Sequence, residues 1–283
     1  DWVRSVAWSP NNQYIASLQG ATRGCRPIDV DTDQKGLRVW DLASGTSTNI
    51  FSSPHEMIVD VSWSPDSLMV ASSGGDVCIW SILDGSLVHT LESEGYIYKS
   101  SWSPAGDRIF TASSEEVTIW DSSNFAPLKH YSGYNLFSCP HDSNYFTIAS
   151  SDGTILTFEY GSAIAKSTNS YISGIESIEL SPDGKYIAIQ PLYRNTIQVL
   201  DISTNETIKV LDGFSDSIFS FKWNSDSCQI ATCSDDLRVW DIFNDDLGVL
   251  SSEIFRYLKY DSLGTQVIHP VGNIGETVSI TRQ

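Results

Sequence analysis

The chain of 283 residues has few basic side chains: 17 lysines and arginines stand against 35 aspartates and glutamates, for a formal net charge of −18. Nucleic acids and anionic membrane surfaces need a positive counter-surface, so this shortage argues against both as partners. A basic protein or peptide would suit the charge, although an acidic surface that only keeps the protein soluble explains it as well. No apolar run approaches the roughly eighteen residues that cross a bilayer, so no membrane insertion is expected.

Cysteine is also scarce. The five cysteines are irregularly spaced and form no CxxC pair, which predicts neither a disulfide framework nor a zinc site. We expect them to be small buried hydrophobic residues in a reducing compartment, which makes the protein intracellular, in the cytoplasm or nucleus. The chain begins at Asp1 without a methionine, so we expect a processed chain or a piece of a longer one.

Patterns that carry chemistry are missing. There is no HExxH, GxSxG, Walker or GxGxxG element, and the histidines are scattered: His55, His89, His130, His141 and His269. The alternating carboxylates from Asp29 to Asp33 resemble a calcium loop, but Gln34 stands where that loop needs glycine and Trp40 where it needs glutamate. We therefore predict no catalytic residue, no metal and no cofactor.

The chain does contain an internal repeat. The segments Val6-Ala-Trp-Ser-Pro10, Val61-Ser-Trp-Ser-Pro65 and Ser100-Ser-Trp-Ser-Pro104 are near copies. The central residue of each copy serves as an anchor, and seven anchors can be aligned: Trp8, Trp63, Trp102, Cys139, Leu180, Trp223 and Tyr260. The residue seven positions after the anchor is apolar in all seven units, and the residue two positions before it is apolar in six.

Each unit is expected to form four short antiparallel strands separated by tight turns. Four strands at a period near forty residues are typical of one β-propeller blade. The sequence thus predicts an all-β, seven-bladed propeller spanning 1–283 as a single domain. The expected blades are 1–51, 52–92, 93–132, 133–170, 171–212, 213–252 and 253–283.

The third strands end on a second motif, which occurs as Trp40-Asp41, Trp120-Asp121 and Trp240-Asp241 and in degraded form elsewhere. With this motif the chain resembles the WD-repeat family over nearly its whole length. The family often has a His, Ser or Thr, Asp and Trp hydrogen-bonded as a tetrad in each blade. Only His55 lies near the His position, so few complete tetrads are expected. By the same resemblance, we expect the outer strand that completes the last blade of this family to be missing here.

The resemblance implies a binding face, which carries the segments that enter each first strand. Residues six and four positions before each anchor would point toward the central opening on that face. The partner-binding residues predicted in this way are Trp2, Arg4, Met57, Val59, Tyr96, Tyr98, Asn135, Glu176, Phe219 and Arg256. Aromatic and arginine side chains dominate interface hot spots, so alanine at Tyr96, Tyr98 and Phe219 is expected to weaken binding and leave folding intact. The alternative is that some of these rings pack into the channel mouth as core.

One unit is longer than the others. There are 32 positions between Trp8 and Trp40 (40 − 8) but 17 between Trp63 and Trp80 (80 − 63), and the excess lies between Gln19 and Gly36. This loop would form one side of a peptide-binding groove. The alternative is a surface insertion that the fold tolerates.

The favoured function is a non-catalytic scaffold that binds a protein or peptide. The alternatives are a recognition propeller of a larger signalling protein, like those attached to STAND or NLR proteins, and, less favoured, a propeller enzyme.

Overall fold

The computed structural model describes residues 3–19, 36–51, 58–92, 95–140, 143–162, 165–170, 174–234, 236–244, 247–251, 255–260, 266–270 and 278–280. The regular elements in this part of the chain are all β-strands, and every pair of neighbouring strands is antiparallel. The chain divides into two compact units, Asp1–Asn135 and Leu136–Gln283, which are described separately.

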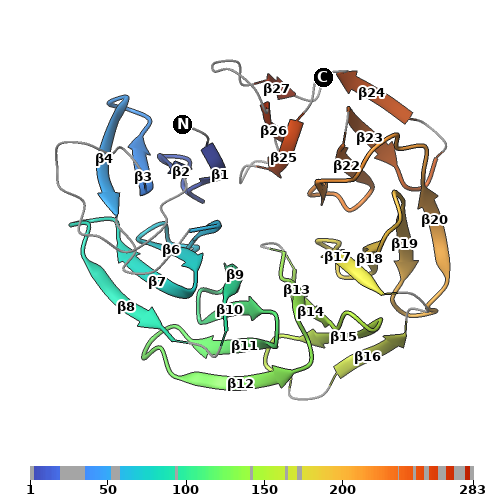
Figure 1. The fold of residues 1–283 in the computed structure, drawn as a ribbon, viewed down its shortest axis with the longest axis horizontal. Coiled ribbons are helices and arrows are strands. Elements are labelled where there is room, and N and C mark those ends of the chain that lie inside the picture. The colour runs from blue at the N-terminus through green and yellow to red at the C-terminus, as the bar shows by residue number, and fades with distance from the viewer. Residues whose placement is uncertain are drawn as a thin grey trace. The chain divides into compact units, whose positions relative to one another are not determined.

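The first unit contains three four-stranded sheets, each hydrogen-bonded in chain order. In this unit β5 contacts both β1 and β9, so the first strands of successive sheets lie side by side, while β4, β8 and β12 lie on the outer side (Figure 1). Its strands are β1 (Val3–Trp8), β2 (Tyr14–Gln19), β3 (Gly36–Asp41), β4 (Thr46–Phe51), β5 (Asp60–Trp63), β6 (Met69–Gly74), β7 (Asp76–Ser81), β8 (Leu87–Leu91), β9 (Ile97–Trp102), β10 (Arg108–Ser113), β11 (Glu116–Asp121) and β12 (Pro127–Ser132).

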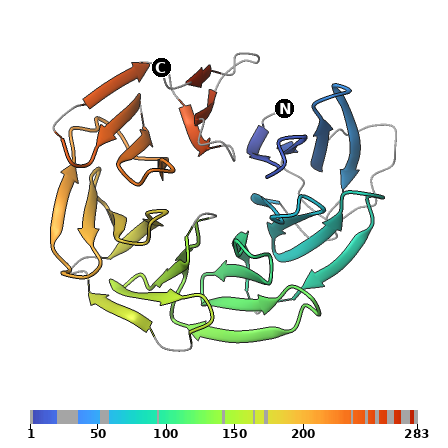
Figure 2. The same ribbon diagram turned by 180° about the vertical axis from the view of Figure 1, so that it is seen from behind.

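The second unit contains three four-stranded sheets and one sheet of three strands, which follow one another in chain order (Figure 2). Here β17 contacts β13 and β21, and β21 contacts β25. Its strands are β13 (Leu136–Ser138), β14 (Tyr145–Ala149), β15 (Thr154–Glu159), β16 (Ala165–Ser170), β17 (Ile175–Leu180), β18 (Tyr186–Pro191), β19 (Ile197–Asp201), β20 (Thr207–Leu211), β21 (Ser220–Trp223), β22 (Gln229–Cys233), β23 (Leu237–Asp241), β24 (Leu247–Ser251), β25 (Phe255–Tyr260), β26 (Gln266–Pro270) and β27 (Val278–Ile280).

The prediction of a seven-bladed propeller needs correction. The described residues form six four-stranded blades, and the last sheet, β25 to β27, contains three strands. Its register also differs, since Tyr260 pairs with Gln266 instead of Val267. This sheet belongs to the part of the sequence that departs most from the repeat, with Tyr260 as anchor and Thr281 where other third strands end on a large apolar residue.

The constant spacing of seven residues has a direct structural cause. The anchor and the residue seven positions later are cross-strand partners, as in the pairs Trp8–Ile15, Trp63–Val70 and Trp102–Ile109. A serine after the anchor closes the turn between them. In the second blade Ser64 donates its hydroxyl hydrogen to Asp66 Oδ1 at 2.6 Å, and its Oγ accepts the N–H of Met69 at 2.9 Å. The Ser-Pro-Asp pattern thus fixes the register of the first hairpin.

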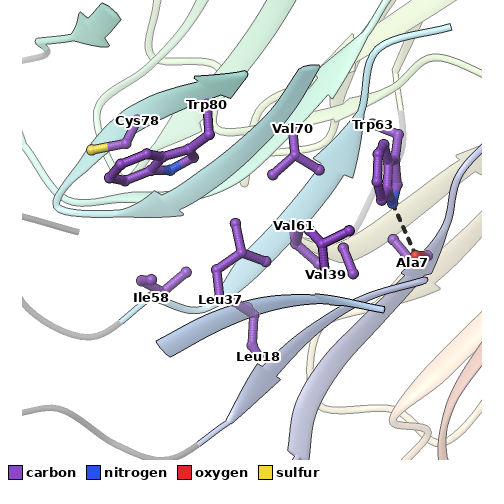
Figure 3. Close-up of a cluster of buried hydrophobic side chains, with 11 residues drawn as sticks. Ala7, Leu18, Leu37, Val39, Ile58, Val61, Trp63, Val70, Cys78 and Trp80 are labelled. Atoms are coloured by element: carbon purple, nitrogen blue, oxygen red, sulfur yellow. Dashed lines mark hydrogen bonds between the residues drawn. The ribbon is translucent and has the colours of Figure 1, made fainter. Parts of the chain in front are cut away.

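Anchor tryptophans also join neighbouring blades within a unit. The indole of Trp63 donates to the carbonyl of Ala7 at 2.9 Å, across the buried cluster between the first two blades (Figure 3). Likewise Trp223 donates to the carbonyl of Glu179 at 3.1 Å in the second unit. Each of these tryptophans therefore fills apolar space between two sheets and also hydrogen-bonds to a main-chain carbonyl of the neighbouring sheet.

In four blades, the tryptophan near the end of the third strand is hydrogen-bonded within its own sheet. Its indole N–H donates to a hydroxyl nine positions after the anchor, at 2.8 to 2.9 Å: Trp40 to Ser17, Trp80 to Ser72, Trp120 to Thr111 and Trp240 to Thr232. The two other four-stranded blades have Phe158 and Leu200 at the tryptophan position, and there the hydroxyl is replaced by Ile148 and Ile189. A buried donor and its acceptor are thus kept or lost together. His55, the nearest candidate for the tetrad histidine, lies outside the described residues.

Candidate partner-binding surface

Each blade has two ends because its strands alternate in direction. We call one the linker end: it carries the segment entering the first strand and the turn between the second and third strands. The opposite end, here the turn end, carries the turns between the first and second and between the third and fourth strands. The predicted binding residues belong to the linker end, since each lies at or just before the start of a first strand.

Four predicted residues can be placed only partly or not at all. Trp2 and Met57 lie outside the described residues, as does the insertion at positions 20–35. The backbone of Arg4 lies in β1 and that of Arg256 in β25, and their side chains are likewise outside the description. Their roles stay predictions.

In the first unit, Tyr96 and Tyr98 flank the start of β9. Ile97 between them is fully buried, and its N–H donates to the carbonyl of Gly75 at 3.0 Å. Tyr96 is 42% exposed, whereas Tyr98 is half-buried. Val59 is also half-buried, with its N–H donating to the Ser73 carbonyl at 2.7 Å. Of these three side chains, Tyr96 offers the most accessible surface to a partner.

Tyr98 has a structural partner. Its hydroxyl donates to the main-chain carbonyl of Asn135, which is itself half-buried. Burial raises the pKa of Tyr98 to about 12, because the phenolate would lose hydration. We therefore expect alanine at Tyr98 to destabilise the fold, since that change would leave the Asn135 carbonyl without its donor and remove the packing of the ring.

In the second unit, Glu176 and Phe219 are both exposed. The N–H of Phe219 donates to the Cys233 carbonyl at 2.9 Å, which fixes the backbone beneath an exposed ring. Glu176 Oε2 accepts a hydrogen bond from the amide of Gln190 at 3.3 Å, and the same amide donates to the Ile218 carbonyl at 3.3 Å. Because the two units are described separately, the continuous arc predicted across both stays a prediction.

The sequence reasoning missed two residues of this end. Gln190 is buried, and its signal was available: it lies ten positions after its anchor, where the other described blades have Leu18, Ser73, Ala112, Ala149 and Cys233. Tyr193 lies in the turn between β18 and β19, is 93% exposed and has a φ of 59°. Bulky residues seldom adopt this left-handed conformation, and such backbone strain clusters at functional sites. No periodic offset marks Tyr193, because its turn varies between blades.

Within the described ranges no three His, Cys, Asp or Glu side chains lie close enough together to hold a metal ion. The aspartates with lowered pKa values are held by hydrogen bonds within tight turns, as when the N–H of Ser44 lowers the pKa of Asp41. Likewise, no helix among the residues described is long and apolar enough to cross a membrane.

Comparison with known proteins identifies the family. The family described as "WD domain, G-beta repeat" matches residues 1–41, 45–81, 85–121 and 205–241, which together make up more than half of the chain. The chain belongs to the WD-repeat family. It is an all-β propeller of the WD type, and members of this family are generally non-enzymatic scaffolds.

Three relatives illustrate the range of WD-repeat proteins similar to this chain. It is 26% identical to protein tipD of Dictyostelium discoideum over 265 residues, covering 84% of this chain and 41% of tipD. It is 25% identical over 247 residues to actin-interacting protein 1 of Drosophila melanogaster, covering 85% of this chain and 33% of the relative. The small ribosomal subunit protein RACK1 of Drosophila melanogaster is 28% identical over 124 residues, 43% of this chain and 35% of RACK1. The chain therefore spans about a third to two fifths of the length of these relatives.

Proposed function

We propose that this WD-repeat chain is a non-catalytic scaffold that binds a protein or peptide at the linker end of its blades. The proposal rests mainly on the accessibility of aromatic side chains there. Tyr96, Tyr193 and Phe219 are each at least two fifths exposed, although large aromatic residues are usually buried. Aromatic side chains supply a large contact area at a small cost in conformational entropy, which is why they dominate binding hot spots.

The rigid support of these rings favours binding as well. Backbone hydrogen bonds hold the residues beside them: Ile97 to Gly75 at 3.0 Å and Leu192 to Gly174 at 2.7 Å. A ring held in place before binding loses less freedom when a partner covers it. Two of the relatives fit the same role, since one is named for its interaction with actin and the other is a ribosomal subunit protein.

The partner is a protein or peptide, and we propose a basic one in view of the net charge of −18. The cysteine pattern supports an intracellular location, in the cytoplasm or nucleus. We also propose that the three-stranded sheet completes a seven-bladed ring. The chain would then act as part of a larger signalling protein.

The test is affinity capture from cell extract with quantitative mass spectrometry, followed by titration of the recovered partner. Three variants, Tyr96→Ala, Tyr193→Ala and Phe219→Ala, should each lower the affinity for that partner by about tenfold, the usual size of a hot-spot effect. Phe243→Ala is the matched control, because Phe243 is an exposed aromatic residue at the turn end. Equal affinity for the triple variant and the wild type would refute the proposal.

A further inference from the structure

A second exposed apolar surface lies at the turn end of the first two blades. It consists of three leucines, which we call the leucine surface: Leu42, Leu68 and Leu83 are 42%, 61% and 94% exposed. Leu68 ends the turn before β6, while Leu42 and Leu83 belong to the turns after β3 and β7. A single exposed leucine needs no explanation, but several on one edge indicate an interaction site.

Hydrogen bonds place the three leucines along one edge. The N–H of Ile82, the residue before Leu83, donates to the carbonyl of Leu68 at 2.9 Å. In the first blade the N–H of Leu42 donates to the carbonyl of Gln13 at 3.0 Å. The two blades are joined where the N–H of Asn11 donates to Ser67 Oγ at 3.1 Å. The leucine surface is thus supported by bonded turns of two packed blades.

The repeat shows that the fold does not require a leucine at the positions of Leu68 and Leu83, whereas the position of Leu42 carries an isoleucine in three other blades. At the position of Leu68, five positions after the anchor, the other four-stranded blades carry Gln13, Asp107, Asn144, Lys185 and Cys228. At the position of Leu83, three of the other turns carry the small residues Ala43, Ser123 and Ser203. Polar or small residues are therefore tolerated in most of these turns, although the sixth blade has Phe243 at the position of Leu83.

Carboxylates surround the leucine surface. Asp41, Asp66 and Asp84 border the same turns, whereas the segments 9–13, 42–45, 64–68 and 82–86 contain no lysine or arginine. Hydrogen bonds from Ser44 and Ser81 lower the pKa values of Asp41 and Asp84, respectively, so both carboxyl groups are ionised at neutral pH. An occupant of this surface meets apolar side chains framed by negative charge.

We propose that the leucine surface docks an amphipathic basic segment of a partner protein, with apolar side chains on the leucines and lysines or arginines beside the carboxylates. The charge of the surface decides this occupant, because an acidic segment would be repelled and a neutral one would leave the negative charge of the carboxylates uncompensated. Since the surface lies at the turn end, a scaffold that binds one partner at the linker end can hold a second at the same time.

The test uses three synthetic peptides of equal length, titrated against the intact chain by fluorescence anisotropy. One contains leucine and lysine on opposite faces, one replaces lysine by glutamate, and one replaces leucine by serine. The first should bind at least tenfold more tightly than either of the others. Leu68→Ser/Leu83→Ser should lower its affinity by about tenfold, and Asp66→Asn/Asp84→Asn should lower it and flatten its dependence on salt. Asparagine retains the Oδ1 acceptor that each turn uses.

The matched control is Leu128→Ser/Ile208→Ser, which removes two exposed aliphatic side chains from the outer strands β12 and β20. Thermal unfolding of each variant tests whether the blades remain folded. Three results would overturn the proposal: equal binding of the glutamate peptide, an equal loss of affinity in the control, or sedimentation showing that the surface joins two copies of this chain.

Discussion

The hydroxyl of Tyr98 donates a hydrogen bond to the main-chain carbonyl of Asn135, and so ties the first strand of the third blade to the end of the first unit. Tyr96, two positions earlier, is exposed. The sequence predicts the same partner-binding role for both tyrosines. In the structure Tyr98 makes a stabilising contact, whereas Tyr96 lies at an accessible surface.

Tyr98→Phe should lower the free energy of unfolding by about 1 kcal/mol, because it removes the donor and leaves the carbonyl of Asn135 in place. Urea denaturation measures this change. Tyr193→Phe is the control, since it removes a hydroxyl from a side chain that is almost fully exposed, and it should leave the midpoint unchanged. An equal effect of both changes would contradict a structural role for the Tyr98 hydroxyl.

Alkaline pH should weaken the fold through the same side chain. Burial raises the pKa of Tyr98 to about 12 from an ordinary value of 10.0, so the unfolded chain loses this proton at lower pH than the folded one. The contribution is fully present below pH 10 and is lost as the pH rises through 12. The free energy of unfolding should fall more between pH 9 and pH 11 in the wild type than in Tyr98→Phe. Parallel pH profiles would show that the hydroxyl does not titrate with folding.

The pairing of Trp240 with Thr232 allows a double-mutant cycle. Thr232→Ile should cost about 1 to 3 kcal/mol, because it leaves the buried indole N–H, which donates at 2.9 Å, without an acceptor. Trp240→Leu combined with Thr232→Ile reproduces the pair found at Leu200 and Ile189, and should cost less than the sum of the two single changes. Equilibrium denaturation of the four proteins gives the coupling, and strict additivity would argue against paired loss of donor and acceptor.

Acid should destabilise the turn ends of the blades. Hydrogen bonds, chiefly from serine hydroxyls or N–H groups and from Asn244, lower the pKa values of Asp41, Asp84, Asp121, Asp201 and Asp241. A lowered pKa in the folded state adds stability above the unfolded value of 3.8, and this stability disappears as the pH falls through the folded value. Denaturation at pH 7 and pH 3 should show a smaller difference in Asp121→Asn than in the wild type. An equal difference in the two proteins would contradict this prediction.

Most of the blade structure could be read from the sequence, because it depends on local relations. The offset of seven between Trp63 and Val70 is the length of one hairpin turn, so the repeat reports the cross-strand register directly. The motif at Trp40-Asp41 likewise predicts the end of a third strand. The last sheet was predicted less well, since Tyr260 and Thr281 carry little of the pattern, and its shifted register was settled by pairing between strands.

The sequence by itself determined the repeat and the strands and predicted the family, because these depend on residues at fixed offsets from the anchors. The tertiary structure decided which side chains face solvent. Tyr98 is anchored by a carbonyl 37 residues away, while Tyr193, Leu68 and Leu83 are left exposed by turns whose neighbours in other blades carry different residues. Exposure depends on what packs against a side chain, and that is set by contacts between blades and not by the spacing of residues along the chain.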